Sequence, residues 1–473
     1  ERLDATNMKK VIAVLLALSM VFSLAACGRA TAEPKSKNVI LMISDGTSVG
    51  IPTLTRWCAS YDRQTGVFNT DTRLNVDPLT SGLIRTYWEN ADGVPGAITD
   101  SAPGGTAFSI GYKTADKYVG VAADGTPHAT VLELAKSLGK STGLVVTVNV
   151  QHATPAAFSA HTTDRRDYEG IAAQMLETGV DVVLGGGSVY LQNRADGRDL
   201  LAELQAQGYD YLTTGEELAA YKGRQVYGLF APDLMEYDID RSRFAPEQPS
   251  LSEMTDKAIE ILSQNNKGFF LMVEGSKVDW AAHNNDPAAA VSEYRAFDEA
   301  VKSAVSFAQG RNDTMVLIVE DHGTGGVSIG SEMSNKTYSS YQLADSIEPL
   351  TRAQITTDGA LRLLAQGHSA EEVLTLYGIT DPTPEELQWT SALTPDPSVA
   401  VSELHAALGA MLSKRCNIGW TTTGHTGEDV VFYSYLPGDE RLTGLFENTE
   451  IAQAICNAWG AKLSDNVCLH QAK

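Results

Sequence analysis

Three side chains in the sequence have the chemistry and spacing of ligands for a zinc ion. Asp279 and His283 are four residues apart, so one turn of helix would place both on the same face, where they can hold one metal. Zinc takes nitrogen and oxygen ligands, and His425, in the segment TTTGHTG, offers a further nitrogen. An aspartate and a histidine at this spacing are more often a surface pair, so the prediction depends on further clusters of the same kind.

Two such clusters follow apolar segments. Asp45 comes directly after NVILMIS and before a glycine, where a single aspartate usually caps a loop. Asp321 and His322 follow MVLIVE, and apolar strands seldom end in such a pair. The occurrence of all these clusters in one chain predicts a metal site more strongly than any one of them does.

A candidate nucleophile lies in the segment TDSAPGGTA. Ser101 precedes a predicted helix, and Pro103 suits the first helical turn, where its missing N–H costs no hydrogen bond. A serine at this position can simply cap the helix. Its oxygen would also face free N–H groups and the positive end of the helix dipole, which together favour phosphate binding. The segment alone leaves both interpretations open.

Short apolar runs that alternate with helical patterns must position these side chains. They predict an α/β fold, a three-layer α/β/α sandwich with a mostly parallel central sheet covered on both faces. Ligands bind beyond the carboxyl ends of strands in such sheets, and three predicted strands run into Asp45, Glu274 and Asp321. The predicted strands cover residues 38–43, 143–148, 181–184, 268–273, 315–319 and 429–433.

Residues 331–415 differ from the rest of the chain. They contain helical patterns separated by proline-rich turns, and they lie between two candidate ligand segments. We predict a helical insertion near the mouth of the site. Ordinary crossover helices that never touch the substrate explain the pattern equally well.

The composition is that of a globular protein. The chain has 473 residues, of which 43% are hydrophobic and 20% charged, which excludes a disordered chain, a coiled coil and a polytopic membrane protein. The formal net charge of −23 argues against nucleic-acid recognition, because phosphate contacts need clustered Lys and Arg. An acidic protein can still act on anions if bound metals reverse the local field.

The N-terminal region has the pattern of a secretion signal. Met8 and two lysines precede a mostly apolar run over residues 11–26, which is short for a membrane span. The run ends in LAACG and resembles the lipobox of bacterial lipoproteins, so we predict a lipid on Cys27 and an extracytoplasmic, membrane-anchored protein. A plain secretion signal that contains a cysteine is the alternative.

The remaining boundaries follow from this interpretation. Residues 1–26 are the signal region, and residues 1–7, which precede the methionine, are interpreted as an over-extended start. Residues 27–37 contain the lipidated cysteine and a flexible tether to a folded domain over residues 38–473. Disulfides are permitted outside the cytosol, and Cys456 with Cys468 is the first candidate pair.

Taken together, the motifs resemble those of the alkaline phosphatase family over nearly the whole chain, from about residue 37 to residue 459. The resemblance rests on six segments in the family's order: ILMISDGTS, ITDSAPGGTAFSIGYKT, VQHATPAAFSAHTTDRRDY, FFLMVEGSKVDWAAH, MVLIVEDHG and TTGHTGEDVVFYSY. It implies an enzyme that hydrolyses small phosphate monoesters, with two Zn²⁺ ions and a third metal, usually Mg²⁺. It also implies a homodimer.

The resemblance assigns roles to individual residues. Ser101 matches the nucleophile that forms a phosphoseryl intermediate, Arg165 matches the arginine that binds the phosphate, and Asp100 matches its orienting partner. Arg166 is the neighbouring alternative to Arg165. The first zinc would be held by Asp279, His283 and His425, the second by Asp45, Asp321 and His322 with Ser101, and the third metal by Asp45, Thr154 and Glu274.

The sequence departs from the best-known bacterial pattern near the third metal. His152, a further candidate ligand of the third metal, stands where many members have Asp, and Trp280 stands where some have Lys. Because imidazole suits zinc or cobalt better than magnesium, we expect His152 to weaken magnesium binding and to allow Zn²⁺ or Co²⁺ at this site. Pro103 also departs from the family's common small residues and removes one N–H from the phosphate cradle.

Other functions fit the sequence less well. A phosphodiesterase or another hydrolase of the same superfamily would use similar ligands, whereas a sulfatase would need an arginine after the proline of SAPGG. A phosphate-binding lipoprotein would fit the lipobox and the α/β pattern. Such a binder has no need of a serine nucleophile beside Asp279, His283 and His425.

Overall fold

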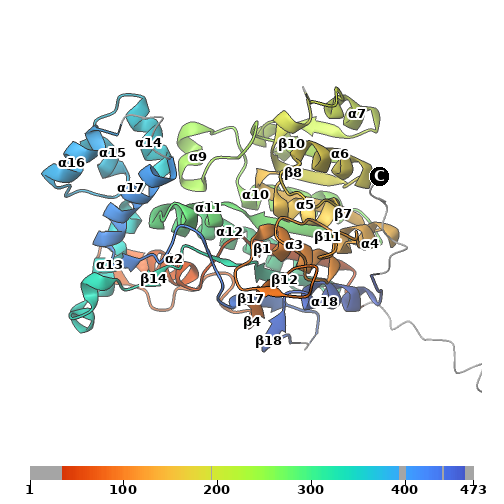
Figure 1. Cartoon of the computed structure of the whole chain (residues 1–473), viewed down its shortest axis with the longest axis horizontal. Helices are drawn as coiled ribbons and strands as arrows, with labels where there is room; N and C mark the ends of the chain where they lie inside the picture. Colours follow the sequence, from red (N-terminus) through yellow and green to blue (C-terminus); the bar gives the residue numbers. More distant parts are fainter. Residues whose placement is uncertain (1–34, 193, 394–400, 439–440, 464–473) are drawn as a thin grey trace, which may run out of the picture.

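A ten-stranded mixed sheet forms the centre of the protein in the computed structural model, which describes residues 35–192, 194–393, 401–438 and 441–463 (Figure 1). All neighbouring strands are parallel except that β17 runs antiparallel to both of its neighbours. The strand order is β18 (Leu445–Glu447), β4 (Thr80–Arg85), β17 (Val430–Tyr435), β12 (Thr314–Glu320), β1 (Asn38–Ser44), β11 (Phe269–Gly275), β7 (Ser141–Asn149), β8 (Val182–Gly186), β10 (Val226–Leu229) and β9 (Asp210–Leu212).

The central strands are buried along their whole length. Every residue of β1, β11 and β12 is buried, as expected for apolar runs in a sheet that is covered on both faces. All six predicted strands are present, with ends that differ by no more than two residues. The strands β4, β9, β10 and β18 were not predicted from the sequence. Strand β4 alternates exposed and less exposed residues next to the edge of the sheet, so it has no continuous apolar run.

Helices cover both faces of this sheet, which confirms the three-layer prediction. Val39 and Leu41 of β1 face a core built with α3 (Ser101–Ile110), α4 (Val131–Ser137), α5 (Ala153–Ser159) and α18 (Glu450–Trp459). Ile40 and Met42 face the opposite core, which is built with α2 (Gly50–Ser60), α10 (Leu251–Leu262) and α12 (Pro287–Ala308). The alternation follows from the two-residue period of a strand.

A group of helices with its own apolar core stands beside the sheet (Figure 1). The group consists of α13 (Leu343–Arg352), α14 (Thr357–Ala365), α15 (Ala370–Leu376), α16 (Pro384–Ser391) and α17 (Val401–Arg415). Leu54 of α2 and Ala288 of α12 belong to the same core, so the group rests on the layer that covers one face of the sheet. From α17 the chain continues through residues 416–424 to His425.

Within the described residues, no helix is both long and apolar enough to cross a membrane. The predicted signal region, Cys27 and most of the tether lie outside the described residues, as does Cys468. Lipidation and the Cys456–Cys468 disulfide therefore stay predictions.

Candidate active site

The candidate ligands gather at the carboxyl ends of three adjacent central strands. Strand β1 lies between β11 and β12, so Asp45, Glu274 and Asp321 come to the same edge of the sheet. The turn after β1 requires Gly46, because φ is +64° and a Cβ atom there would lie 2.4 Å from Asp279 Oδ1. Its N–H donates to Asp321 Oδ1 at 3.0 Å, which ties the first turn to the third strand.

The first cluster contains the three residues with the chemistry of zinc ligands. Helix α11 (Lys277–His283) places His283 Nε2 3.3 Å from Asp279 Oδ2 and 3.0 Å from His425 Nε2. The Nδ1 atoms of both histidines donate to carbonyl oxygens, those of Thr423 (2.6 Å) and Thr99 (2.9 Å). The Nε2 atoms of both rings therefore face each other beside Asp279, and they are the ring atoms that could bind a cation there.

Protonation in the first cluster is set by burial and by the neighbouring charges. Burial opposes the charged form of His283, but its hydrogen bond with Asp279 outweighs this and raises the pKa of His283 to about 9. Burial and the nearby His322 lower the pKa of His425 to about 4. The first cluster thus carries one positive charge on its imidazole rings, on His283 beside Asp279. A metal ion held by the same three residues would supply positive charge at this place instead.

The second cluster is fully buried. His322 Nε2 lies 3.4 Å from Asp45 Oδ1 and 3.5 Å from Asp321 Oδ2, and none of these three side chains is exposed. The Asp279 carboxylate lies near both clusters, because its oxygens are within 4.8 Å of the ligand atoms of His283 and His425 and also of those of Asp45 and His322. Burial, followed by repulsion from Asp321, raises the pKa of Asp45 well above its usual value. Buried carboxylates this close together need a counter-ion to stay charged.

A third group of oxygen atoms contains Glu274 and Thr154. Glu274 accepts from Ser276 Oγ at 2.6 Å, whereas its second oxygen and the buried Thr154 Oγ1 make no hydrogen bond of good geometry, although Thr154 is close enough to Glu274 to stabilise its charged form. Burial raises the pKa of Glu274 to about 7. Unpartnered carboxylate and hydroxyl oxygens are the ligands that magnesium prefers, so the donor set fits a third metal.

His152 is oriented towards Arg165. Its Nε2 lies 3.2 Å from Arg165 NH2, and because a guanidinium only donates, the ring nitrogen accepts. Its other ring nitrogen is buried without a hydrogen-bond partner. Burial and the charge of Arg165 lower the pKa of His152 to about 3, so the ring is neutral. The structure thus places His152 at Arg165. Because the neutral ring accepts at Nε2, its proton is on Nδ1, and that nitrogen could bind a metal only if the proton left it.

Ser101 is the first residue of α3 and points at the second cluster. Its Oγ lies 3.3 Å from Asp45 Oδ1 and 3.4 Å from His322 Nε2. The helix is capped by Asp100, whose carboxylate accepts from Ala102 N at 2.8 Å, so capping does not occupy Ser101. This decides between the two roles that the sequence left open, and it leaves the Ser101 hydroxyl available as a nucleophile.

The two glycines after Pro103 allow α3 to approach the sheet. A Cβ atom on Gly104 would lie 3.1 Å from Asp321 Cβ, and one on Gly105 would lie 3.2 Å from Ala157 Cβ of α5. Larger residues would push α3 away from both neighbours. The unusual segment SAPGG therefore keeps Ser101 within reach of the metal ligands.

Arg165 lies next to the start of α3. Its NH1 lies 2.9 Å from Asp100 Oδ2, and this pairing outweighs the effect of burial and raises the pKa of the guanidinium. Arg166 is exposed, so of the two neighbouring arginines the structure favours Arg165 as the candidate. Asp100 thus caps α3 and orients Arg165 at the same time.

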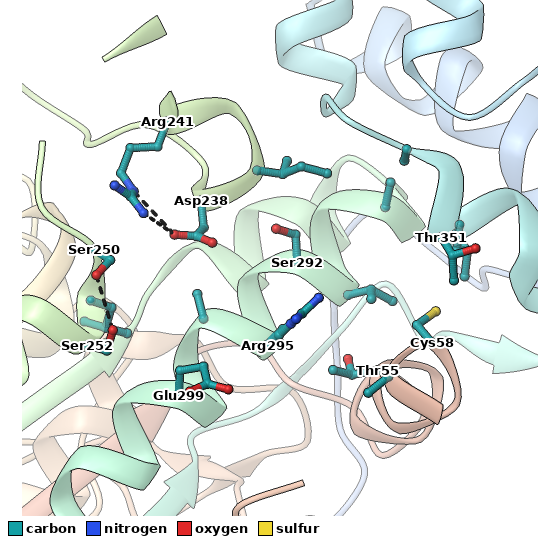
Figure 2. A pocket seen from close by; sticks show the side chains of 18 of the residues that line it. Thr55, Cys58, Asp238, Arg241, Ser250, Ser252, Ser292, Arg295, Glu299 and Thr351 are labelled. Carbon is teal, nitrogen blue, oxygen red and sulfur yellow. Dashed lines mark hydrogen bonds and ion pairs between the residues drawn. The ribbon is translucent and has the colours of Figure 1, made fainter. Parts of the chain in front are cut away.

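The site is separate from a cavity of about 600 Å³ elsewhere in the molecule (Figure 2). That cavity lies among α2, α9 (Asp238–Phe244), α10, α12 and α13, and none of the candidate site residues lines it. Arg241 and Asp238, both of α9, pair at 3.2 Å on one side of the cavity (Figure 2). The chemistry of this protein is therefore at the edge of the sheet and not in this cavity.

Residues 36–461 match the model of the alkaline phosphatase family. The chain belongs to this family. The match covers all the site residues described above and nearly all of the described chain, in agreement with the resemblance of the motifs.

Individual alkaline phosphatases agree with this assignment. Alkaline phosphatase 4 of Bacillus subtilis is 37% identical over 467 residues, which cover 95% of this chain and 96% of the relative. The crystal structure of a cold-active alkaline phosphatase from Shewanella superimposes with a TM-score of 0.78 at 32% identity and covers 90% of this chain and 100% of that one. A histidine-to-aspartate variant of the alkaline phosphatase from the Antarctic bacterium TAB5, with Mg bound in its M3 site, has a TM-score of 0.64 at 28% identity, and covers 91% of this chain and 99% of that one.

Several residues that support this alkaline phosphatase site were not found from the sequence. Thr324 Oγ1 donates to Asp279 Oδ1 at 2.6 Å, and Ser276 holds one oxygen of Glu274. The carbonyl groups of Thr99 and Thr423 fix the orientation of the two histidines. A main-chain carbonyl has no signature in a sequence, and small hydroxyl residues near ligands are common, so only the fold identifies them.

Proposed function

We propose that this alkaline phosphatase transfers the phosphoryl group of its substrate first to Ser101 and then to water, with two zinc ions held by the two ligand clusters. Hydrolysis of phosphate monoesters is the activity of the family to which the chain belongs. The observation that carries the proposed route is the position of Ser101 Oγ, within 3.4 Å of both Asp45 and His322.

The residues present fit the metals that the route needs. The site contains buried carboxylate oxygens without a hydrogen-bond partner, on Glu274 and Asp321, and two Nε2 atoms that face each other. A positive charge between these groups would stabilise them. When bound, two zinc ions supply the charge that favours the alkoxide of Ser101 and the negative charge on the leaving oxygen. The first would be held by Asp279, His283 and His425, and the second by Asp45, Asp321 and His322.

Side chains of the protein then position the phosphoryl group of the substrate. Arg165 presents a planar fork that can bind two phosphoryl oxygens, and Asp100 keeps that fork in place. In the first step the bond from phosphorus to Ser101 Oγ forms and the bond to the leaving oxygen breaks; the Oγ proton passes to solvent, and the leaving alkoxide takes up a proton from solvent. In the second step a water oxygen bonds to phosphorus and the bond to Oγ breaks; one water proton goes to Ser101 Oγ and the other stays on the released phosphate. A loose transition state makes such positioning the main task of the protein.

The third site is proposed to hold magnesium on oxygen atoms of Asp45, Thr154 and Glu274. His152 has a neutral ring and removes the negative charge that an aspartate would add, so zinc or cobalt is proposed as an alternative occupant. The magnesium-bound histidine-to-aspartate variant of the TAB5 enzyme supports testing this exchange here.

The sequence supports two further proposals about the whole protein. The LAACG motif supports a lipid on Cys27 and an extracytoplasmic enzyme held at a membrane. The family resemblance supports a homodimer that acts on small phosphate monoesters of broad structure. Light scattering of the purified protein measures its mass, and a monomer of 50.7 kDa would contradict the dimer.

Replacement of the nucleophile tests the proposed route. Ser101→Ala removes the only proposed acceptor of the phosphoryl group, so we expect no phosphoserine and a loss of several orders of magnitude in kcat, on the scale of about 10³ to 10⁶. The control is Ser391→Ala, a change on the exposed side of α16. Labelled phosphate trapped on another residue, or full activity of Ser101→Ala, would contradict the route.

A further inference from the structure

The phosphate-binding arginine lies in a segment without helix or strand of its own. Residues between α5 and α6 (Tyr168–Thr178) carry Arg165, so the position of its backbone depends on contacts with other parts of the chain. One such contact is direct, because Arg165 N donates to the carbonyl of Lys117 at 3.0 Å. Arg165 can bind phosphate only if the strip of backbone around it is fixed.

That strip is paired with residues 117–120. Thr162 and Val119 exchange two backbone hydrogen bonds of 2.9 Å, and the Lys117 contact extends the pairing towards Arg165. At the other end the two segments approach so closely that a Cβ atom on Gly120 would lie 2.1 Å from the carbonyl oxygen of Ala160. Each of these two loop segments is therefore held in place by the other, and neither forms part of the ten-stranded sheet.

His161 fastens this pair of loops to the helices. Its Nδ1 lies 2.6 Å from the carbonyl oxygen of Gly120, and its Nε2 lies 3.1 Å from Glu133 Oε1. Its backbone N–H donates to Gln174 Oε1 of α6 at 2.8 Å. Both members of the His161–Glu133 pair are almost completely buried, with side chains 1% and 0% exposed. The imidazole therefore spans from one loop to α4, while its main chain is held by α6.

Glu133 is itself rigid. It is the third residue of α4, where Glu133 Oε2 accepts from Thr130 N at 2.9 Å and Thr130 Oγ1 accepts from Glu133 N, a capping box. Thr130 Oγ1 also donates to the carbonyl of Phe158 at the end of α5. The carboxylate that binds His161 is thus fixed by the start of one helix and the end of another.

We propose that the buried His161–Glu133 pair positions Arg165 for phosphate binding, four residues along the chain from His161. His161 is a positioning residue in this proposal, because the hydrogen bonds described above join it to Gly120, Glu133 and Gln174. An error of about 1 Å in the placement of a binding group can cost about 100-fold in rate. The inference rests on the proposed role of Arg165 in binding the phosphate.

A double-mutant cycle with Arg165 tests the proposal, with inorganic phosphate as the probe. We expect His161→Gln to raise the Ki of phosphate by roughly 3- to 30-fold in the holoenzyme with Arg165 present, and by less than about 2-fold in the Arg165→Ala background. Glu133→Gln preserves length and removes the charge beside the imidazole, and we expect a smaller change in the same direction. This second variant keeps the test available if His161→Gln does not fold, which melting curves would show.

His368→Gln is the matched control. It breaks another His–Glu pair, His368 with Glu372 at 3.0 Å, which is exposed and lies in the helical group. The Ki should stay within about 2-fold of the unaltered enzyme, a difference too small to indicate coupling.

The possible failures can be told apart. If the His161 variant changes the Ki of phosphate equally with and without Arg165, the inference is wrong. It is also wrong if neither the His161 nor the Glu133 variant changes this Ki. Both results would leave the role of Arg165 intact. A Ki that Arg165→Ala does not change would overturn both the inference and the proposed role of Arg165.

Discussion

His152 is the residue by which this site differs most from the common bacterial pattern. The sequence suggested it as a ligand for the third metal, whereas the structure shows its Nε2 on Arg165, at 3.2 Å. The ring is neutral, because burial and the adjacent guanidinium oppose a second positive charge. A neutral ring adds no negative charge to the proposed third site, so we expect magnesium to bind there weakly.

Exchange of this histidine for a carboxylate should strengthen the third site. We expect His152→Asp to tighten magnesium binding by about 10- to 100-fold, the range in which groups around a metal alter its affinity, without loss of the two zinc ions. Activity titrated with magnesium at fixed, saturating zinc measures the change, and metal analysis counts the zinc. His368→Asp, on the exposed side of the helical group, is the control. Superimposable magnesium curves would show that His152 does not tune this site.

At the scale of the elements, two buried aspartates join the helical group to the layer above the sheet. Asp240 of α9 accepts from Thr356 N at 3.1 Å and also from Thr356 Oγ1, at the start of α14. Asp286, the N-cap of α12, accepts from Thr357 N at 2.7 Å and from Tyr377 OH at 2.9 Å. Both carboxylates are completely buried, so these contacts fix how α14 sits against α9 and α12.

The burial of Asp240 should make this junction sensitive to pH. Burial raises its pKa to about 6, above the unfolded value of 3.8, so between these values the folded protein binds more protons than the unfolded chain. Stability therefore falls as the pH rises through this window. We expect the unfolding free energy of the unaltered protein to fall relative to that of Asp240→Asn by roughly 2 kcal/mol between pH 4 and pH 7.

Urea unfolding of both proteins at several pH values, with zinc present, measures this difference. Asp358→Asn changes a more exposed aspartate in α14 and serves as the control. A constant difference between the unaltered protein and Asp240→Asn would show that the Asp240 carboxyl does not titrate in this range.

At the scale of the whole molecule, the carboxylates of the site link metal binding to folding. Burial raises the pKa of Asp45, Asp321 and Glu274, for Glu274 from 4.5 to about 7. Without metals, ionisation of these groups destabilises the folded state, and this cost grows as the pH rises through 4.5 to 7. Metals that bind the folded protein remove this cost of the buried negative charges, and their binding free energy stabilises the folded state further.

We therefore expect chelation to lower the Tm by several degrees, on the order of 5 °C or more, and by more at pH 8 than at pH 6. Calorimetry with and without chelator measures the shift, and added zinc should restore the original Tm. A Tm that chelation leaves unchanged at both pH values would contradict the link between the metal site and folding.

The proposed lipid anchor gives another prediction for the whole molecule. If Cys27 carries lipid, the native protein should sediment with membranes, and Cys27→Ser should release it or block its processing, because a lipid chain adds about 0.8 kcal/mol of membrane binding for each buried CH₂ group. Membrane fractionation and mass spectrometry of the N-terminus test this. A freely soluble protein with an unmodified N-terminus would contradict it.

The sequence by itself determined the central strands of the sheet and most of the candidate site residues. Short continuous apolar runs, such as those of β1, β11 and β12, indicate strands buried on both faces, and an aspartate or histidine directly after such a strand lies at the edge of the sheet. The family motifs then identified Ser101 and Arg165 among many serines and arginines. These conclusions need only local patterns, which is why they could be made without a structure.

Only the tertiary structure decided the remaining points. Asp100 caps α3 and leaves Ser101 free, His152 turns to Arg165, and Glu133 reaches His161 across 28 residues of chain. The strand β4 is found only through its pairing with β17 and β18, since its own residues have no apolar pattern. Each of these facts depends on which atoms meet after folding, and the energy of a buried hydrogen bond depends on a partner that the local sequence does not contain.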